Sequence, residues 1–189
     1  YNLMRLMAED RQDLTIRVFD SVSGSLGMGL TLLQLAEDIR GGATWEELVG
    51  TRVPQLIAST FPFFSVDTLE YLQKGGRIGK VTATAGTLLQ IKPLLTFAGD
   101  GQLKSVAKVR GRNQVIQKLV DLTVKSCGTH RRYNLAVANG GAPKEMEVLR
   151  SRLMAALPDY DHIWEGEIDG TLSVYIGDGV LGAAVQVLD

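Results

Sequence analysis

The feature that most constrains the fold is the alternation of helix-like and strand-like segments along most of the 189-residue chain. Apolar residues recur at helical spacing over three long segments: 29–39, 113–126 and 143–156. Apolar and β-branched runs predict strands at three places: 133–138, 160–165 and 180–188. Gly99-Asp100-Gly101 separates two further strand-like runs within 91–109 and is a hairpin signal. The alternation predicts an α/β fold, and the hairpin predicts that its sheet is mixed.

The first 61 residues show helix-like and strand-like segments in the order helix, strand, helix, helix. The strand is expected over 14–19, and Thr44 with Glu47 forms a capping-box pattern ahead of a helix reaching about residue 57. This order is half of a doubly wound α/β unit. Because the chain opens inside an uncapped helical pattern at Tyr1, we expect an N-terminal part to be missing. We therefore predict two domains: the remainder of an N-terminal α/β domain over 1–61, and a C-terminal mixed-sheet α/β domain over 62–189.

The rest of the chain adds smaller elements. A short helix is expected to carry Leu69 and Leu72, and another helix is expected over about 82–89. Residues 171–176 are compatible with either a strand or a short helix.

Composition and charge exclude several classes of protein. Hydrophobic residues make up 45% of the chain and charged residues 22%, which is enough apolar material for a packed core. The net charge of −1 gives no basis for general nucleic-acid binding. Cys127 is the only cysteine, so we expect no intramolecular disulfide or cysteine-cluster metal site and favour a reducing cytoplasm. Without a long apolar stretch or a leader pattern, stable membrane anchoring is not expected.

Two glycine-containing stretches are candidates for an anion site. In DSVSGSLGMG, residues 20–29, Ser21 and Ser25 lie between the expected strand and helix, where backbone amides favour an anion. The spacing matches neither a Walker loop nor a dinucleotide fingerprint. A capped turn between a strand and a helix is the simpler interpretation of this stretch alone.

The second stretch, LEYLQKGGRIGK over 69–80, is harder to explain as a helix end alone. Gly75 accounts for the end of the helix, but Gly76 and Arg77 follow it directly. A guanidinium here could meet a carboxylate or phosphate with two hydrogen bonds, or it could be an ordinary surface arginine. The KVRGR stretch over 108–112 is open to the same two interpretations.

Catalytic and metal-binding sets are not evident in the sequence. His130 and His162 are far apart, and Asp159 with Asp161 fits a turn before a strand. Cys127 has no acid–base partner placed by the sequence, and a buried thiol is favoured. We therefore disfavour an enzyme, and we predict no catalytic residues, metal or cofactor.

Taken in order, DSVSGSLGMG, VDTLEYLQKGGRIGK, IKPLL and KVRGR resemble the successive motifs of the DegV family over nearly the whole chain. The resemblance implies a two-domain α/β protein that buries one long-chain fatty acid in a tunnel. It also implies a carrier role for some members, which present the carboxylate to a fatty acid kinase. The tunnel lining is not assigned; four residues near the arginine motif could contribute, although core packing is the default for each: Leu88, Leu89, Ile91 and Leu94.

The resemblance also places the ligand-binding residues. It puts Arg77 at the fatty acid head group, with Gly75 and Gly76 allowing close backbone approach, and Ser21 and Ser25 nearby. Two departures from the family bear on phosphate transfer. Tyr175 stands at the family's histidine position and Asp178 at a proline, and the family's serine and threonine contacts correspond to segments before Tyr1. A neutral tyrosine does not replace a titrating histidine.

Two other functions stay open from the sequence. One is a small-molecule phosphotransferase or hydrolase that uses the Ser21/Ser25 loop and Arg77 around a phosphate. The other is a regulatory or scaffold protein in which a lipid only stabilises the fold.

Overall fold

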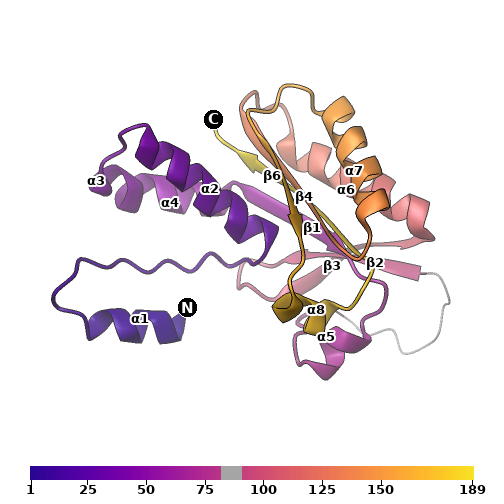
Figure 1. The fold of residues 1–189 in the computed structure, drawn as a ribbon, viewed down its shortest axis with the longest axis horizontal. Coiled ribbons are helices and arrows are strands. Elements are labelled where there is room, and N and C mark those ends of the chain that lie inside the picture. The colour runs from indigo at the N-terminus through magenta and orange to yellow at the C-terminus, as the bar shows by residue number, and fades with distance from the viewer. Residues whose placement is uncertain (82–90) are drawn as a thin grey trace.

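A six-stranded mixed sheet organises the computed structural model, which describes residues 1–81 and 91–189 (Figure 1). The strands are β1 (Thr60–Ser65), β2 (Ile91–Phe97), β3 (Leu103–Arg110), β4 (Tyr133–Gly140), β5 (Ile163–Glu167) and β6 (Val180–Val187). The helices are α1 (Asn2–Glu9), α2 (Leu26–Arg40), α3 (Trp45–Glu47), α4 (Val53–Ala58), α5 (Glu70–Lys74), α6 (Arg112–Cys127), α7 (Pro143–Ala156) and α8 (Gly170–Ile176). A π-helical turn, Leu48–Arg52, joins α3 to α4. The helix expected over 82–89, with Leu88 and Leu89, lies outside the described residues.

The sheet order is β3-β2-β1-β6-β4-β5. Only β4 and β5 pair in parallel among the described strands, and α7 makes the crossover between them. The predicted mixed α/β fold is therefore confirmed.

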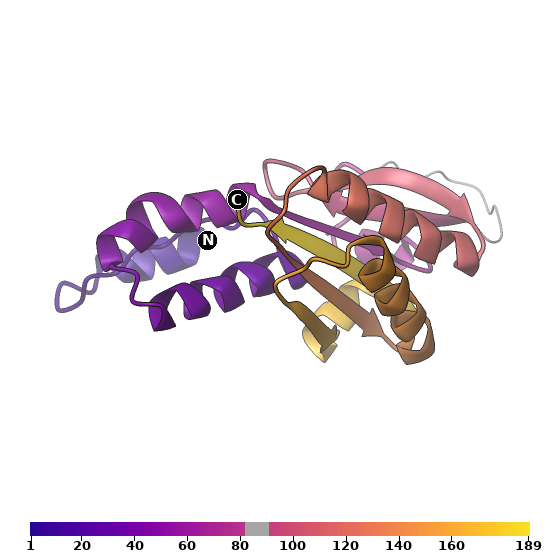
Figure 2. The same cartoon turned by 90° about the horizontal axis from the view of Figure 1, so that it is seen from above.

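One face of the sheet is covered by α6 and α7 (Figures 1 and 2). Alternate strand residues point to this face, as the two-residue period of a strand requires. Phe63, Leu94, Val137 and Leu181 pack there with Leu119 of α6 and neighbouring residues of both helices. This is the main closed core, and it fixes the orientation of the strands.

The opposite face is covered by α2, α5 and α8. Helix α2 lies over β6 and β4, where Leu30 packs on Ala136 and Ala184. Buried amides fasten it there: Asn134 Nδ2 donates a hydrogen bond to Gln34 Oε1 at 2.7 Å and another to Gln186 Oε1 at 3.2 Å. Helices α5 and α8 pack together farther along the same face, beyond α2 (Figure 1).

Strand β1 contains a proline and was not expected from the sequence. Proline is rare in central strands because it lacks a backbone N–H. Here β1 pairs with β2 only through Phe64 and Ser65, so Pro62 lies where the ladder with β2 is absent. The hydroxyl of Thr96 on β2 donates to the Pro62 carbonyl at 2.6 Å instead.

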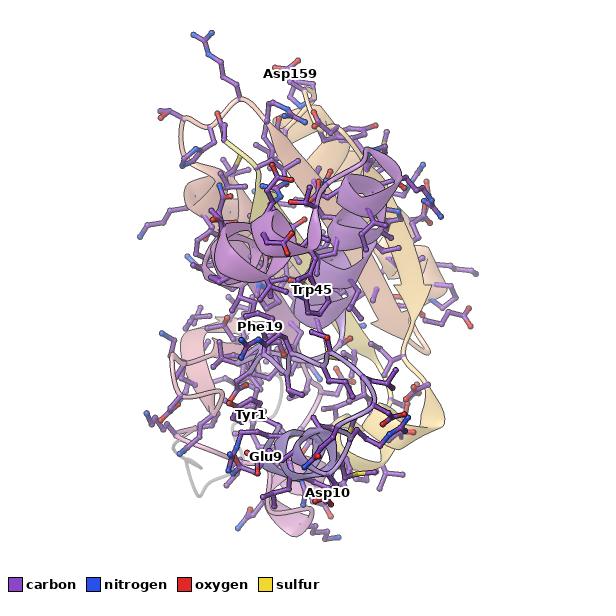
Figure 3. All side chains as sticks on the ribbon, turned by 90° about the vertical axis from the view of Figure 1, so that its left-hand side faces the viewer. Tyr1, Glu9, Asp10, Phe19, Trp45 and Asp159 are labelled. Carbon is purple, nitrogen blue, oxygen red and sulfur yellow. The ribbon has the colours of Figure 1, made fainter. Side chains whose placement is uncertain are left out.

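The N-terminal prediction was partly wrong. Residues 14–19 form no strand, and the described part of residues 1–58 is helical or irregular. Helix α1 buries none of its residues and lies apart from the sheet (Figure 1). In Figure 3, Phe19 lies between Trp45 above it and Tyr1 below it. The predicted domain boundary at residue 61 falls inside β1, and the division into two domains stays a prediction.

Predictions based on local signals agree better with the structure. The Thr44–Glu47 capping box is present, the hairpin joins β2 to β3 around Gly99-Asp100-Gly101, and α7 begins at Pro143. The ambiguous segment at 171–176 lies in α8. In the described residues, no helix combines the length and apolar character needed to cross a bilayer.

Candidate functional site: an apolar cavity beside Arg77

A cavity of about 480 Å³ lies on the face of the sheet that α2, α5 and α8 cover. Phe64 and Phe97 from β1 and β2, Leu172 and Ile176 from α8, and Leu26 from α2 contribute to its lining. Among the described residues, the polar side chains in the lining are Ser25, Arg77, Gln102 and Tyr175. Such a cavity suits a ligand that is largely apolar and carries one polar group.

Small residues make the floor of this cavity. Ala138 of β4 and Gly182 of β6 lie side by side in the sheet and both line it. A side chain at Gly182 would project into the cavity, because an added Cβ would lie 3.1 Å from the Leu26 Cδ1 atom at the tip of that side chain. These floor residues were not predicted, although the small residues at alternate positions of 133–140 and 180–187 are visible in the sequence.

Arg77 follows α5 and lines the cavity. Its guanidinium carbon lies 4.6 Å from the centre of the Tyr175 ring, and its Nη1 donates a hydrogen bond to the Gly75 carbonyl at 2.8 Å. Within 1–81 and 91–189, no carboxylate forms an ion pair with Arg77. The guanidinium is thus held in place by two contacts while its charge stays available to an anionic ligand.

Glycines shape the backbone around Arg77. At Gly75, an added Cβ would lie 2.4 Å from Tyr175 Cδ1, so the absent side chain makes room for that ring. Gly76 lines the cavity with φ +67°, a left-handed conformation that favours glycine. At Gly79, with φ +58°, an added Cβ would lie 2.7 Å from the backbone N and O atoms of Leu103. The turn carrying Arg77 therefore packs directly on β3.

The two serines expected near the ligand, Ser25 and Ser21, differ in whether they reach the cavity. Ser25 lines it, but its side chain does not cap α2, which begins at Leu26. Ser21 is not part of the lining, and its Oγ donates to the Ser23 carbonyl at 3.1 Å. The expected strand-to-helix turn is therefore an irregular loop, and it has φ +44° at Val22 and +48° at Ser25. Positive φ is rare for a β-branched residue, so this loop is strained.

Tyr175 and Asp178 lie in different surroundings. Tyr175 on α8 lines the cavity and stacks on Arg77. Asp178 is exposed and lies against Gly141, where its Oδ1 occupies the position that a side chain on that glycine would need. The structure therefore brings together Gly76, Arg77, Tyr175 and Ser25 at the cavity, with Gly75 directly behind Tyr175.

The other residues singled out in the sequence lie outside the cavity. Cys127 is buried in the core, and burial raises the pKa of its thiol, which keeps it protonated and unreactive. Asp161 accepts a hydrogen bond from Arg132 at 2.8 Å. Leu94 belongs to the closed core, while Ile91 is partly exposed at the start of β2. Among the residues that the structure describes, no three histidine, cysteine or acidic side chains form a group able to hold a metal ion.

Comparison with protein families gives one match over most of the chain. Residues 1–187 match the model of the family described as "Uncharacterised protein, DegV family". A DegV domain-containing protein of Clostridium acetobutylicum is 31% identical over 185 residues, which cover 98% of this chain and 65% of that protein. The chain thus spans slightly less than two thirds of this relative's length.

Solved structures show the same fold. A DegV family protein from Thermus thermophilus, described as fatty acid binding, superposes with a TM-score of 0.88 at 27% identity, covering 97% of this chain and 65% of that one. A stearic acid-binding protein from Eubacterium ventriosum superposes with a TM-score of 0.83 at 26% identity, covering 98% of this chain and 64% of that one.

Proposed function

Because this chain belongs to the DegV family, we propose that its apolar cavity binds one long-chain fatty acid whose carboxylate faces Arg77. The observation that carries the proposal is the combination in one cavity of an almost wholly apolar lining and a positioned arginine without a carboxylate partner in the described residues. The fatty acid binding of the Thermus and Eubacterium proteins supports it.

The two ends of a fatty acid have different requirements. Burial of an alkyl chain contributes about 0.8 kcal/mol per methylene, so affinity comes from the length of chain that the cavity covers. The carboxylate needs hydrogen-bond donors and a positive charge to offset its loss of water. Arg77 supplies the charge, and the part of the chain that the structure describes adds the hydroxyls of Ser25 and Tyr175 and the side-chain amide of Gln102 to the lining.

The role we propose is that of an intracellular carrier without catalytic residues or a cofactor of its own. Arg77 is solvent-exposed, so a carboxylate held there stays within reach of another protein. A fatty acid kinase subunit would bind ATP, and a carboxylate oxygen would attack the γ-phosphate to form an acyl phosphate and release ADP.

Mass spectrometry of the full-length natural protein under native conditions, followed by denaturing extraction, tests the binding proposal. We expect one fatty acid per chain. A protein that purifies empty, takes up no added fatty acid and instead binds phosphate or a nucleotide would favour the phosphotransferase or hydrolase alternative.

Replacement of Arg77 tests the position of the carboxylate. The Arg77→Gln variant removes the charge, and we expect fatty acid affinity to fall roughly tenfold because a charge-assisted contact is lost. Lys74→Gln is the matched control, since Lys74 is an exposed cation on α5 that pairs with Glu70 and does not line the cavity. Equal affinities of the two variants in a fluorescent fatty acid displacement assay would remove Arg77 from the site.

A further inference from the structure

Helices α5 and α8 contact each other through two aromatic rings, each of which lies on a glycine at the end of the opposite helix. Tyr175 of α8 lies on Gly75, where an added Cβ would be 2.4 Å from the ring atom Cδ1. Tyr71 of α5 lies on Gly177, where an added Cβ would be 2.7 Å from the ring atom Cδ2. The two contacts are reciprocal, so a shift of one helix along the other disturbs both of them.

Gly177 ends α8 two residues after Tyr175. Its φ of +76° turns the chain away from the helix, and its N–H donates to the Ser173 carbonyl at 2.8 Å. The turn then reaches the sheet, where the Gly179 N–H donates to the Gly140 carbonyl of β4 at 2.7 Å. Helix α8 itself contains no buried residue. Contacts at its end, with the Tyr71 ring among them, therefore contribute strongly to the position of Tyr175.

The contact at the other glycine leads to Arg77. The carbonyl of Gly75 accepts a hydrogen bond from Arg77 Nη1 at 2.8 Å, and its N–H donates to the Tyr71 carbonyl, also at 2.8 Å. The guanidinium therefore contacts a carbonyl at the end of α5 and the ring of Tyr175 on α8. Its position depends on how these two helices are held together, and the Tyr71 ring is one of the contacts that hold them.

Tyr71 is not itself part of the cavity lining, and it is 45% exposed. Its side chain would therefore act on a bound ligand only through residues that do line the cavity. Arginine has many rotamers, and ordering them opposes binding. A guanidinium that is already held in place loses less conformational entropy when it meets a carboxylate, and preorganisation of this kind strengthens binding.

We propose that Tyr71 is a positioning residue for Arg77. Its ring, resting on Gly177, keeps Tyr175 where it holds the guanidinium at the cavity, and this raises the preference of the site for a carboxylate over a neutral head group. The inference rests on the proposed function, because it requires the fatty acid carboxylate to meet Arg77. It also gives Gly75 and Gly177 a common role, since each leaves space for a ring from the opposite helix.

Competition assays with palmitic acid and 1-hexadecanol test the inference on the full-length natural protein and its variants, since the two ligands have alkyl chains of similar length and differ in head-group charge. We expect Tyr71→Ala to weaken palmitic acid binding about three- to fivefold, less than the roughly tenfold effect of Arg77→Gln, and to leave 1-hexadecanol binding unchanged. Tyr71→Phe keeps the ring and should keep the natural preference. Val174→Ala is the matched control, because Val174 is exposed on α8 and lies outside the lining.

A double-mutant cycle shows whether Tyr71 acts through Arg77. In the Arg77→Gln background, we expect Tyr71→Ala to cause no further loss of palmitic acid affinity, because the guanidinium that the ring positions is gone. Gly177→Ala disturbs the same contact from the α8 side, since its Cβ would press on the Tyr71 ring, and we expect the same selective loss. An equal loss from Tyr71→Ala in both backgrounds would overturn the positioning role.

The outcomes separate this inference from the proposed function. A natural protein that binds neither ligand, or binds both equally well, contradicts a carboxylate at Arg77, and the inference fails with it. If the natural protein prefers palmitic acid but Tyr71→Ala weakens both ligands by the same factor, Tyr71 only supports the wall of the cavity. The positioning role is then overturned, although the binding function stands. Loss of palmitic acid affinity alone in Tyr71→Ala and Gly177→Ala, but not in Tyr71→Phe, supports the inference.

Discussion

The two faces of the sheet are built from the same strands but are packed differently. On β6, Leu181 and Ala183 point into the closed core beneath α6 and α7, while Gly182 points into the cavity between α2 and α8. On β4, Val137 packs in the core and Ala138 lines the cavity. Large side chains at alternate positions fill one face, and small ones at the positions between leave space on the other. The stability of the sheet therefore comes largely from one face, and the cavity proposed to hold a ligand lies on the other.

The largest expected effect separates two adjacent residues of β6. Leu181→Ala removes a fully buried side chain from the closed core, and we expect the free energy of unfolding to fall by about 2–5 kcal/mol. Gly182→Ala adds a methyl group to the cavity face, where only the tip of Leu26 must move, and should cost less than about 1 kcal/mol. Urea denaturation of both variants measures the difference, and similar losses would contradict the division between the faces.

A smaller effect is expected in the turn that carries Arg77. Gly79→Ala would force a Cβ against the Leu103 backbone at a left-handed φ, and we expect a loss of about 1–3 kcal/mol together with weaker fatty acid binding. Gly76→Ala is the matched comparison, because its φ is also positive but the space around it is open, so its cost should be about 1 kcal/mol. If thermal unfolding shows Gly76→Ala to be the more harmful change, packing on β3 does not position Arg77.

The smallest expected effect tests the contact between Tyr175 and Arg77. Tyr175→Ala removes the ring that holds the guanidinium, and a stacking contact at an exposed site is worth about 0.5–1 kcal/mol, which predicts a two- to fivefold weaker affinity for fatty acid. Tyr175→Phe keeps the ring and should bind almost as the natural protein does. A large loss in Tyr175→Phe, measured in the same displacement assay, would show that the hydroxyl binds the carboxylate directly.

Local signals in the sequence predicted much of the fold. The hairpin at Gly99-Asp100-Gly101 and the helix beginning at Pro143 are determined by neighbouring residues, and both were predicted close to their observed limits. Strand β1 was missed because Pro62 is tolerated where the ladder with β2 is absent, and only the folded sheet defines that pairing. The strand expected over 14–19 was wrong because alternation of side chains does not by itself supply a neighbouring strand.

Only some of the residues expected at the ligand lie together in the structure. Arg77, Gly76, Tyr175 and Ser25 do meet at one cavity, and Ser21 does not. Their proximity was inferred from the family resemblance, because the chain separation between Arg77 and Tyr175 gives no local signal. The floor of the cavity depends on strand register, which places Gly182 beside Ala138. No property of either residue alone indicates that pairing.

The alternation along β6 also has an evolutionary consequence. A lineage can exchange Gly182 for a larger residue without altering Leu181 or Ala183, because adjacent positions face opposite sides of the sheet. Substitutions that change the cavity and substitutions that change the core therefore fall at separate positions of one short strand. The shape of the cavity can thus change in single mutational steps, without compensatory changes in the core.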